Sequence, residues 1–205
     1  MNTSPARPVN HHADHRGFGG VTGLIAGLVM LMAGGARARL AVDVASVSGA
    51  DRVVDIGCGP GRSVRIAARR GAAVIGVDPA SVMLRLARIC TRDHPAITWS
   101  QGAVETLPVP DGWATVVWSI ATVHHWRDVT AGLAEVRRVL APGGRFLVVE
   151  RQVHADATGL ASHGWTEHQV QSFAAACRAA GFDALRIDRR SCGRHVVWIV
   201  QARRP

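Results

Sequence analysis

From Asp51 onward, short apolar runs alternate with segments whose apolar residues recur at helical spacing. This alternation predicts a β-α array built around a mostly parallel sheet. Five apolar runs predict its first strands, at residues 52–56, 73–77, 97–100, 115–119 and 145–150. Two further runs, at residues 184–188 and 196–200, bring the expected sheet to seven strands. We therefore expect a doubly wound α/β fold with helices on both faces of the sheet.

The last two apolar runs differ in their patterning. Residues 184–188 alternate apolar and polar side chains, as an exposed edge strand does, whereas residues 196–200 are continuously apolar. A continuous run is typical of a strand covered on both faces. The link of four residues from Ser191 to Arg194 suits an antiparallel hairpin. The last strand is therefore predicted to be antiparallel and to lie inside the sixth.

Helices are expected between these strands, at about residues 62–70, 79–93, 129–141 and 167–180. Asp128 is a candidate N-cap of the third, and Thr166 with Gln169 forms a candidate capping box for the fourth. The second helix is expected to bury an apolar face made of Val82, Leu86, Ile89 and Cys90.

The chain divides into an N-terminal tail and helical lid, residues 1–49, and one α/β domain, residues 50–205. Residues 17–36 carry no charge and approach the length of a membrane-spanning helix, but they include seven glycines. We expect this segment to pack on the domain as a lid. Peripheral membrane contact and export remain alternatives.

Composition narrows the chemistry. All 24 basic residues are arginine, so lysine-based Schiff-base chemistry is excluded. The net charge of +9 comes from arginines that are spread along the chain. This spread indicates arginines on solvated surfaces and disfavours a nucleic-acid interface, which needs them gathered on one face. No GxSxG or GxxxxGK[ST] sequence is present, so hydrolase and nucleotide triphosphatase motifs are absent.

Cysteine and histidine spacing offers no metal site. The four cysteines are far apart, which indicates neither zinc nor a disulfide framework and fits a reducing, cytoplasmic location. The densest histidine group, residues 11–15, lacks a matching group at ligand spacing and is expected to be an exposed tail. We assign no metal ligand.

A glycine-rich turn follows the first predicted strand. Gly57, Gly59 and Gly61 form GxGxG directly after Asp55 and Ile56, and Arg62 stands where the dinucleotide GxGxxG motif needs a third glycine. Glycine allows positive φ and lets backbone approach a ligand closely. Doubly wound sheets bind ligands at the carboxyl ends of strands, so we expect a cofactor cleft here.

Asp78 ends the second predicted strand, 21 residues after Gly57. A carboxylate at this place can accept hydrogen bonds from both ribose hydroxyls of an adenosine ligand, although a lone aspartate also suits a helix cap. The coincidence of strand, glycine turn and acidic residue favours the ribose role.

Four segments, in order, resemble the class I S-adenosylmethionine-dependent methyltransferase family, and particularly its short, type 11-like members. They are residues 53–63, 76–79, 102–126 and 139–150. The third carries Gly102-Ala103-Val104-Glu105-Thr106-Leu107-Pro108-Val109-Pro110-Asp111-Gly112 and, further on, His124-His125-Trp126, similar to the family motif GxAExLPFPDGxFDxVxxxxxLHHW. The resemblance covers about residues 50–205. It implies a Rossmann-like fold, S-adenosyl-L-methionine as cofactor and methyl transfer as activity.

The resemblance also implies roles for individual residues. By this resemblance, four residues surround the methionine part of the cofactor: Asp55, Gly57, Gly59 and Gly61. Asp78, followed by Pro79, would hold the ribose, and Ala103 and Val104 would line the adenine. Ser119 would start the loop over the sulfonium.

Two positions depart from the family pattern. Ala103 stands where many members have an acidic residue for the adenine amino group, which leaves backbone groups or Glu105 as candidates. Thr115 stands where the fourth strand usually opens with an acidic residue.

The candidate catalytic residues are His124 and His125, which follow the fourth predicted strand. An imidazole titrates in the range that a general base needs, but a base is required only for a protonated acceptor. Histidines at this place can instead simply pack or cap the loop.

The favoured hypothesis is methyl transfer to a small-molecule acceptor, with residues 17–36 and 151–165 shaping the acceptor pocket. Ala103 and Thr115 motivate a non-catalytic cofactor-binding module as an alternative. The positive charge suggests an RNA or DNA methyltransferase, against which stand the few aromatic residues and the absence of an [ND]PP[YF] sequence. An NAD(P)-dependent oxidoreductase is opposed by Arg62. Titration with each cofactor or with oligonucleotides separates these hypotheses.

Overall fold

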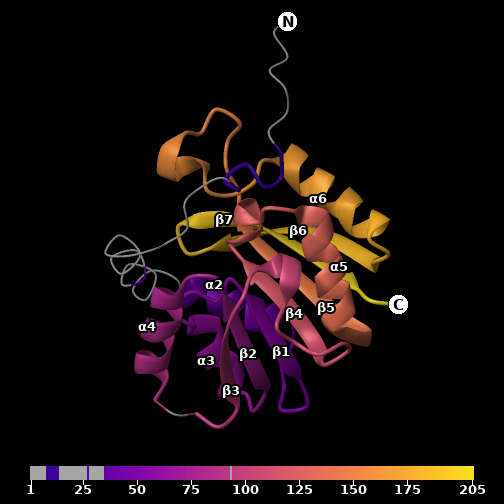
Figure 1. The fold of residues 1–205 in the computed structure, drawn as a ribbon. Coiled ribbons are helices and arrows are strands. Elements are labelled where there is room, and N and C mark those ends of the chain that lie inside the picture. Colours follow the sequence, from indigo (N-terminus) through magenta and orange to yellow (C-terminus); the bar gives the residue numbers. More distant parts are fainter. Residues whose placement is uncertain (1–7, 14–26, 28–34, 93) are drawn as a thin grey trace, which may run out of the picture.

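The computed structural model describes residues 8–13, 27, 35–92 and 94–205, and Figure 1 shows its fold. One sheet has the strand order β3-β2-β1-β4-β5-β7-β6. Its strands are β1 (Arg52–Ile56), β2 (Ala73–Asp78), β3 (Ile97–Gln101), β4 (Ala114–Ile120), β5 (Leu140–Arg151), β6 (Asp183–Cys192) and β7 (His195–Arg203). The α-helices are α2 (Gly35–Val44), α3 (Arg62–Ala68), α4 (Ser81–Thr91), α5 (Val129–Val139) and α6 (Glu167–Ala179), with short 3-10 helices η1 (Val104–Thr106), η2 (Val123–His125) and η3 (Gly159–Ser162).

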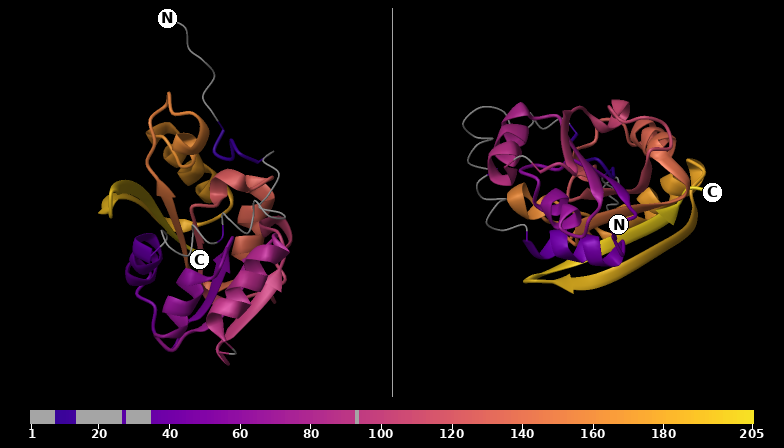
Figure 2. Two further views of the ribbon diagram at one scale, coloured as in Figure 1. Left: turned by 90° about the vertical axis from the view of Figure 1, so that its left-hand side faces the viewer. Right: turned by 90° about the horizontal axis from the view of Figure 1, so that it is seen from below.

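The predicted seven-strand topology is confirmed. Strands β1 to β5 pair in parallel, and β7 pairs antiparallel with both β5 and β6. The continuously apolar strand therefore lies inside the alternating one, which forms the sheet edge. In the right-hand view of Figure 2 these two strands, in yellow, run side by side along the lower edge of the molecule.

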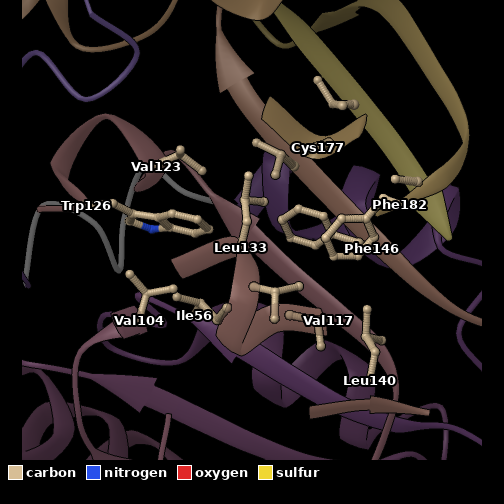
Figure 3. Packing of buried hydrophobic residues seen from close by; sticks show 14 of the residues in the cluster. Ile56, Val104, Val117, Val123, Trp126, Leu133, Leu140, Phe146, Cys177 and Phe182 are labelled. Atoms are coloured by element: carbon tan, nitrogen blue, oxygen red, sulfur yellow. The ribbon is translucent and has the colours of Figure 1, made fainter. Parts of the chain in front are cut away.

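Strand alternation divides the core between the two faces of the sheet. Val54 and Val117 face α5 and α6, whereas their neighbours Val53 and Val116 face α2 and α3. Figure 3 shows part of the first cluster, in which Leu133 of α5 packs near the ring of Phe146. Helices thus cover both faces, as a Rossmann-like doubly wound fold requires.

The two predicted N-caps are present. The Asp128 side chain accepts hydrogen bonds from the backbone N–H groups of Thr130 and Ala131. Thr166 and Gln169 form a reciprocal capping box at the start of α6. Both caps satisfy backbone donors that a helix N-terminus leaves unpaired.

Two details of the helix predictions were wrong. Helix α4 begins at Ser81 and buries Met83, Leu84, Leu86 and Ala87, while Ile89 is 74% exposed and Cys90 is also exposed. Helix α5 ends at Val139, since Leu140 already has an extended backbone and belongs to β5.

The Pro-Gly-Gly segment after Leu140 forms an irregularity within β5. Ala114 pairs with Leu140 and Val116 with Arg145, so residues 141–144 are accommodated as a bulge. The predicted strand at residues 145–150 was therefore too short at its beginning.

Residues 8–13 do not form the exposed tail predicted for the histidine group. Asn10 Nδ2 donates to the carbonyl oxygens of Trp126 and Arg127, and Trp165 Nε1 donates to the carbonyl of Val9. His11 and His12 are both half-buried. These polar contacts anchor the segment, while Asp14 and His15 lie outside the described residues.

The predicted lid at residues 17–36 falls mostly outside the described residues. Gly27, within it, is buried, and a side chain there would clash with Leu86 and crowd Met83 of α4. In the part of the chain that the structure describes, every helix is too short or too polar to cross a membrane.

Candidate active site

A cavity of about 920 Å³ lies where β1, β2, β3 and β4 end at their carboxyl termini. Chain connections leave β1 and β4, which are neighbours in the sheet, in opposite directions, so a crevice forms between them. The loops that line the cavity follow these strands, at residues 56–60, 78–83, 101–105 and 120–127. The cavity size lies within the range of about 300–1,000 Å³ of small-molecule sites.

The glycine turn after β1 is anchored to the neighbouring strand. The backbone N–H groups of Gly57 and Cys58 donate to the carbonyl of Val77, at 2.8 and 3.0 Å. Gly57 has φ +69°, and a Cβ there would lie 2.5 Å from Thr122 Cγ2. The turn therefore needs glycine both for its backbone conformation and for its close approach to the loop after β4.

Gly59 and Gly61 differ in their relation to the cavity. Gly59 has φ +52° and lines the cavity. Gly61 has φ +76°, is the N-cap of α3, and would place a Cβ 2.1 Å from the Trp99 ring. Packing against Trp99 therefore explains why position 61 is glycine. The neighbouring residues Pro60 and Arg62 line the cavity.

Asp55 is buried at the floor of the cavity, 1% exposed. Its carboxylate accepts a hydrogen bond from Ser63 Oγ. Burial raises the pKa of Asp55 to about 7, an effect that this hydrogen bond opposes. A positively charged ligand near Asp55 would stabilise its ionised form and so offset the effect of burial.

Asp78 lies beside the glycine turn at the end of β2. Its two carboxylate oxygens accept hydrogen bonds from the N–H groups of Gly59 and Ala80, both at 2.8 Å. Burial raises the pKa of Asp78, and these two bonds oppose the rise. An ionised carboxylate offers about four acceptor positions, so capacity remains for a diol such as a ribose.

The other predicted cofactor residues divide between lining and support. Pro79, Ala103 and Val104 line the cavity. Ser119 is fully buried, hydrogen-bonds Thr122 Oγ1, and adjoins the lining residues 120–122 without being one of them. Its observed contact supports the loop after β4.

Glu105 is one of the two candidates for the adenine amino group. It lines the cavity, but its Oε1 accepts hydrogen bonds from the N–H groups of Arg127 and Asp128. Those bonds tie the loop after β3 to the start of α5.

Thr115 lies away from the cavity, near the start of β4. Its hydroxyl donates to Asp51 Oδ1 at 2.8 Å and accepts from the N–H of Arg52 at 3.0 Å. Asp51 also pairs with Arg145 at 2.5 Å. Thr115 therefore joins a polar network that connects neighbouring strands, and its departure from the family pattern does not alter the cavity.

His124 and His125 both line the cavity, from η2. His124 is 1% exposed, and its Nδ1 lies 3.0 Å from Glu150 Oε2, while Glu150 Oε1 accepts from the N–H of Val123 at 3.0 Å. His125 Nδ1 lies 3.4 Å from the carbonyl of His12. Burial lowers the pKa of His125 to about 4, so this imidazole is neutral at pH 7.

The sequence analysis did not name several of the lining residues as site residues. Five arginines line the cavity: Arg37, Arg62, Arg85, Arg127 and Arg151. His163, from the long connection after β5, also lines it, and His124, His125 and His163 bring their ligand atoms within 4.8 Å of one another. No spacing in the sequence connects position 163 with positions 124 and 125.

Comparison with known proteins agrees with this geometry. A family profile described as a methyltransferase domain matches residues 54–148. YdaC of Bacillus subtilis, described as a methyltransferase, is 25% identical over 89% of this chain and 99% of its own length. The demethylmenaquinone methyltransferase of Tropheryma whipplei is 35% identical over 55% of this chain and 46% of its own length. An S-adenosylmethionine-dependent methyltransferase structure from Mesorhizobium loti has a TM-score of 0.67 at 22% identity, covering 83% of this chain and 99% of that one.

The chain is similar to S-adenosylmethionine-dependent methyltransferases: a methyltransferase profile matches residues 54–148, YdaC is related over nearly its whole length, and the Mesorhizobium loti structure shares the fold. The sequence resemblance implies S-adenosyl-L-methionine as the cofactor, and a phosphoethanolamine N-methyltransferase structure from Haemonchus contortus that contains it has a TM-score of 0.68 at 15% identity. Several other curated relatives match this chain over only 30% to 47% of their own length. Their substrates are therefore not transferred to this chain.

Proposed function

We propose that the chain methylates a small-molecule acceptor that binds in the same cavity as the cofactor. The observation that carries the proposal is the continuity of this cavity. Its lining includes Asp55 and Asp78, which we assign to the cofactor, together with His124 and His163, which we assign to the acceptor. At about 920 Å³ it lies near the upper end of the range for small-molecule sites, which suits a cofactor together with a small partner.

The cofactor side fits an adenosine ligand with a cationic methionine part. Asp78 would accept the ribose hydroxyls, and the turn at Gly57 and Gly59 would let the methionine part approach the backbone. Asp55 would face the positive charge of the cofactor, which would stabilise the ionised carboxylate that burial disfavours. The bound cofactor supplies an activated methyl group, so the chain's main task is positioning.

The arginines of the lining suggest an acceptor with an anionic group. Arg37 of α2, Arg62 of α3 and Arg151 of β5 reach the lining from three elements. Guanidinium groups bind carboxylates and phosphates in fork-like geometry. Arg151 and His163 also support the prediction that residues 151–165 shape the acceptor pocket.

The proposal is tested first on the cofactor residues. Calorimetric titration of the full chain with S-adenosylmethionine and its demethylated product should show binding, and Asp78→Asn should weaken it by at least about tenfold. Asp183→Asn, the same change on the exposed edge strand β6, is the matched control and should bind as the parent does. Equal affinities in all three proteins contradict the ribose role of Asp78.

The acceptor is tested by measuring release of the demethylated cofactor with a panel of small phenols, amines, thiols and carboxylates. Turnover with a panel member supports the proposal. Cofactor binding without turnover on any of them favours a non-catalytic module. Tight, salt-sensitive oligonucleotide binding together with oligonucleotide methylation favours a nucleic-acid acceptor instead.

A further inference from the structure

Three histidines meet on the acceptor side of the cavity. His124 and His125 come from η2, and His163 follows η3, in the connection between β5 and α6. One ring nitrogen of each lies within 4.8 Å of those of the other two. A tetrahedral zinc ion with Zn–N distances of about 2.0–2.1 Å needs ligand nitrogens about 3.4 Å apart, so small side-chain rotations bring these three to bonding distance.

The polar contacts of two of these histidines match those of metal ligands. The Nδ1 atom of His124 faces Glu150 Oε2, and the Nδ1 atom of His125 faces the carbonyl of His12. A carboxylate and a carbonyl accept hydrogen bonds, so in a neutral imidazole that donates from Nδ1 the lone pair lies on Nε2, the nitrogen that can bind a metal. Histidine ligands of metals typically donate their second ring N–H to a carboxylate or a backbone carbonyl in this way.

Neighbouring groups hold the cluster in place. Glu150 is fully buried and is also fixed by the N–H of Val123. Arg151 Nε donates to the backbone carbonyl of His163 at 2.9 Å, which fixes the third member. The ring of His12 stacks on His163 with centroids 4.3 Å apart, so the segment at residues 8–13 covers the cluster.

We propose that His124, His125 and His163 form a binding site for one divalent transition-metal ion, with Zn²⁺ as the favoured occupant. Imidazole nitrogens suit zinc, and three protein ligands leave its fourth position open. All three histidines line the cavity, so the open position faces the acceptor space.

The open position points to the class of acceptor, an inference that rests on the proposed function. An acceptor hydroxyl or thiol bound to the metal would lose its proton to solvent more readily, because the metal stabilises the resulting anion. The acceptor would then need no protein base. His124 and His125 would act as metal ligands in place of the general-base role considered from the sequence.

The site is tested on the full chain, stripped of metal with a chelator and titrated with Zn²⁺ or Co²⁺ alone. We expect one ion per chain and visible absorption bands of tetrahedral Co²⁺ that Zn²⁺ abolishes. His163→Ala should weaken Zn²⁺ binding by about 100-fold or more, and Glu150→Gln by about 10- to 100-fold. His168→Ala, which removes an exposed histidine on α6, is the matched control and should leave affinity unchanged.

The outcomes separate the metal site from the proposed function. Zn²⁺ affinity that is the same in the parent, His163→Ala and His125→Ala overturns the metal site. Cofactor titration in the presence of chelator tests the proposed function by itself and also shows that each variant is folded. A simple thiol should bind the open fourth coordination position and shift the Co²⁺ absorption bands of the parent. Unchanged bands would refute the claim that the metal has an open position.

Discussion

Replacing Asp55 by asparagine removes a buried carboxyl group from the lining of the cavity. Burial raises the pKa of Asp55 from 3.8 to about 7, so near neutral pH much of it is protonated before the cofactor binds. A cation within about 4–6 Å lowers a carboxyl pKa by about 1–3. The cationic cofactor should therefore release a proton from Asp55 as it binds, and its affinity should rise by about tenfold between pH 6 and pH 8.

The assay is calorimetric titration of the parent and Asp55→Asn with S-adenosylmethionine at pH 6, 7 and 8. The titration is repeated in buffers of different ionisation enthalpy, because the dependence of the measured heat on the buffer gives the number of protons released. The parent should release close to one proton at pH 6 and lose that release by pH 8, while Asp55→Asn should show a much flatter affinity profile. Any pH dependence of affinity that remains in Asp55→Asn is attributed to Asp78, because burial also raises the pKa of that carboxyl group. An equal rise in affinity in both proteins would refute the role of Asp55.

The same carboxyl group makes folding stability depend on pH. Its pKa in the folded protein is raised, so its favourable contribution is complete below pH 3.8, declines as pH rises, and is lost above about pH 7. The shift corresponds to about 4 kcal/mol. Asp55→Asn should therefore gain stability relative to the parent between pH 5 and pH 8, as measured by urea unfolding. A constant difference would contradict the raised pKa.

Three further predictions concern packing and backbone geometry. Leu133→Ala should lower the free energy of unfolding by about 2–5 kcal/mol, because Leu133 is 1% exposed in the core, and urea unfolding at constant m-value checks this. Asp128→Ala should cost about 1 kcal/mol through loss of the α5 cap, with unchanged cofactor affinity by calorimetry. Gly57→Ala should weaken cofactor binding and stability together, since its φ is +69° and the new Cβ meets Thr122. Adding Thr122→Ser, which removes the nearest methyl group, should restore part of both losses, and no recovery would argue against the contact.

The sequence by itself predicted seven strands with the last one inside the sixth, and several residues that line the cavity. Continuous and alternating apolar runs predicted that β7 lies inside β6, because a strand covered on both faces cannot place polar side chains without cost. Asp55, Gly57, Gly59 and Asp78 were found from motifs, because their positions relative to the strand ends are local and each strand end carries its own loop to the cavity.

Only the tertiary structure showed which distant segments meet at the cavity and where several elements begin and end. His163 lies 38 residues beyond His125, and nothing local relates the two until the connection after β5 folds over η2. His11 and His12, taken from the sequence as part of a tail, are half-buried because backbone and side-chain hydrogen bonds to distant loops hold them there. Helical periodicity also predicted that Ile89 is buried, whereas it is exposed. A helical pattern alone does not show which apolar side chains pack against another element. Local pattern determines elements and the turns between them, whereas contacts between distant segments depend on the packing of the whole chain.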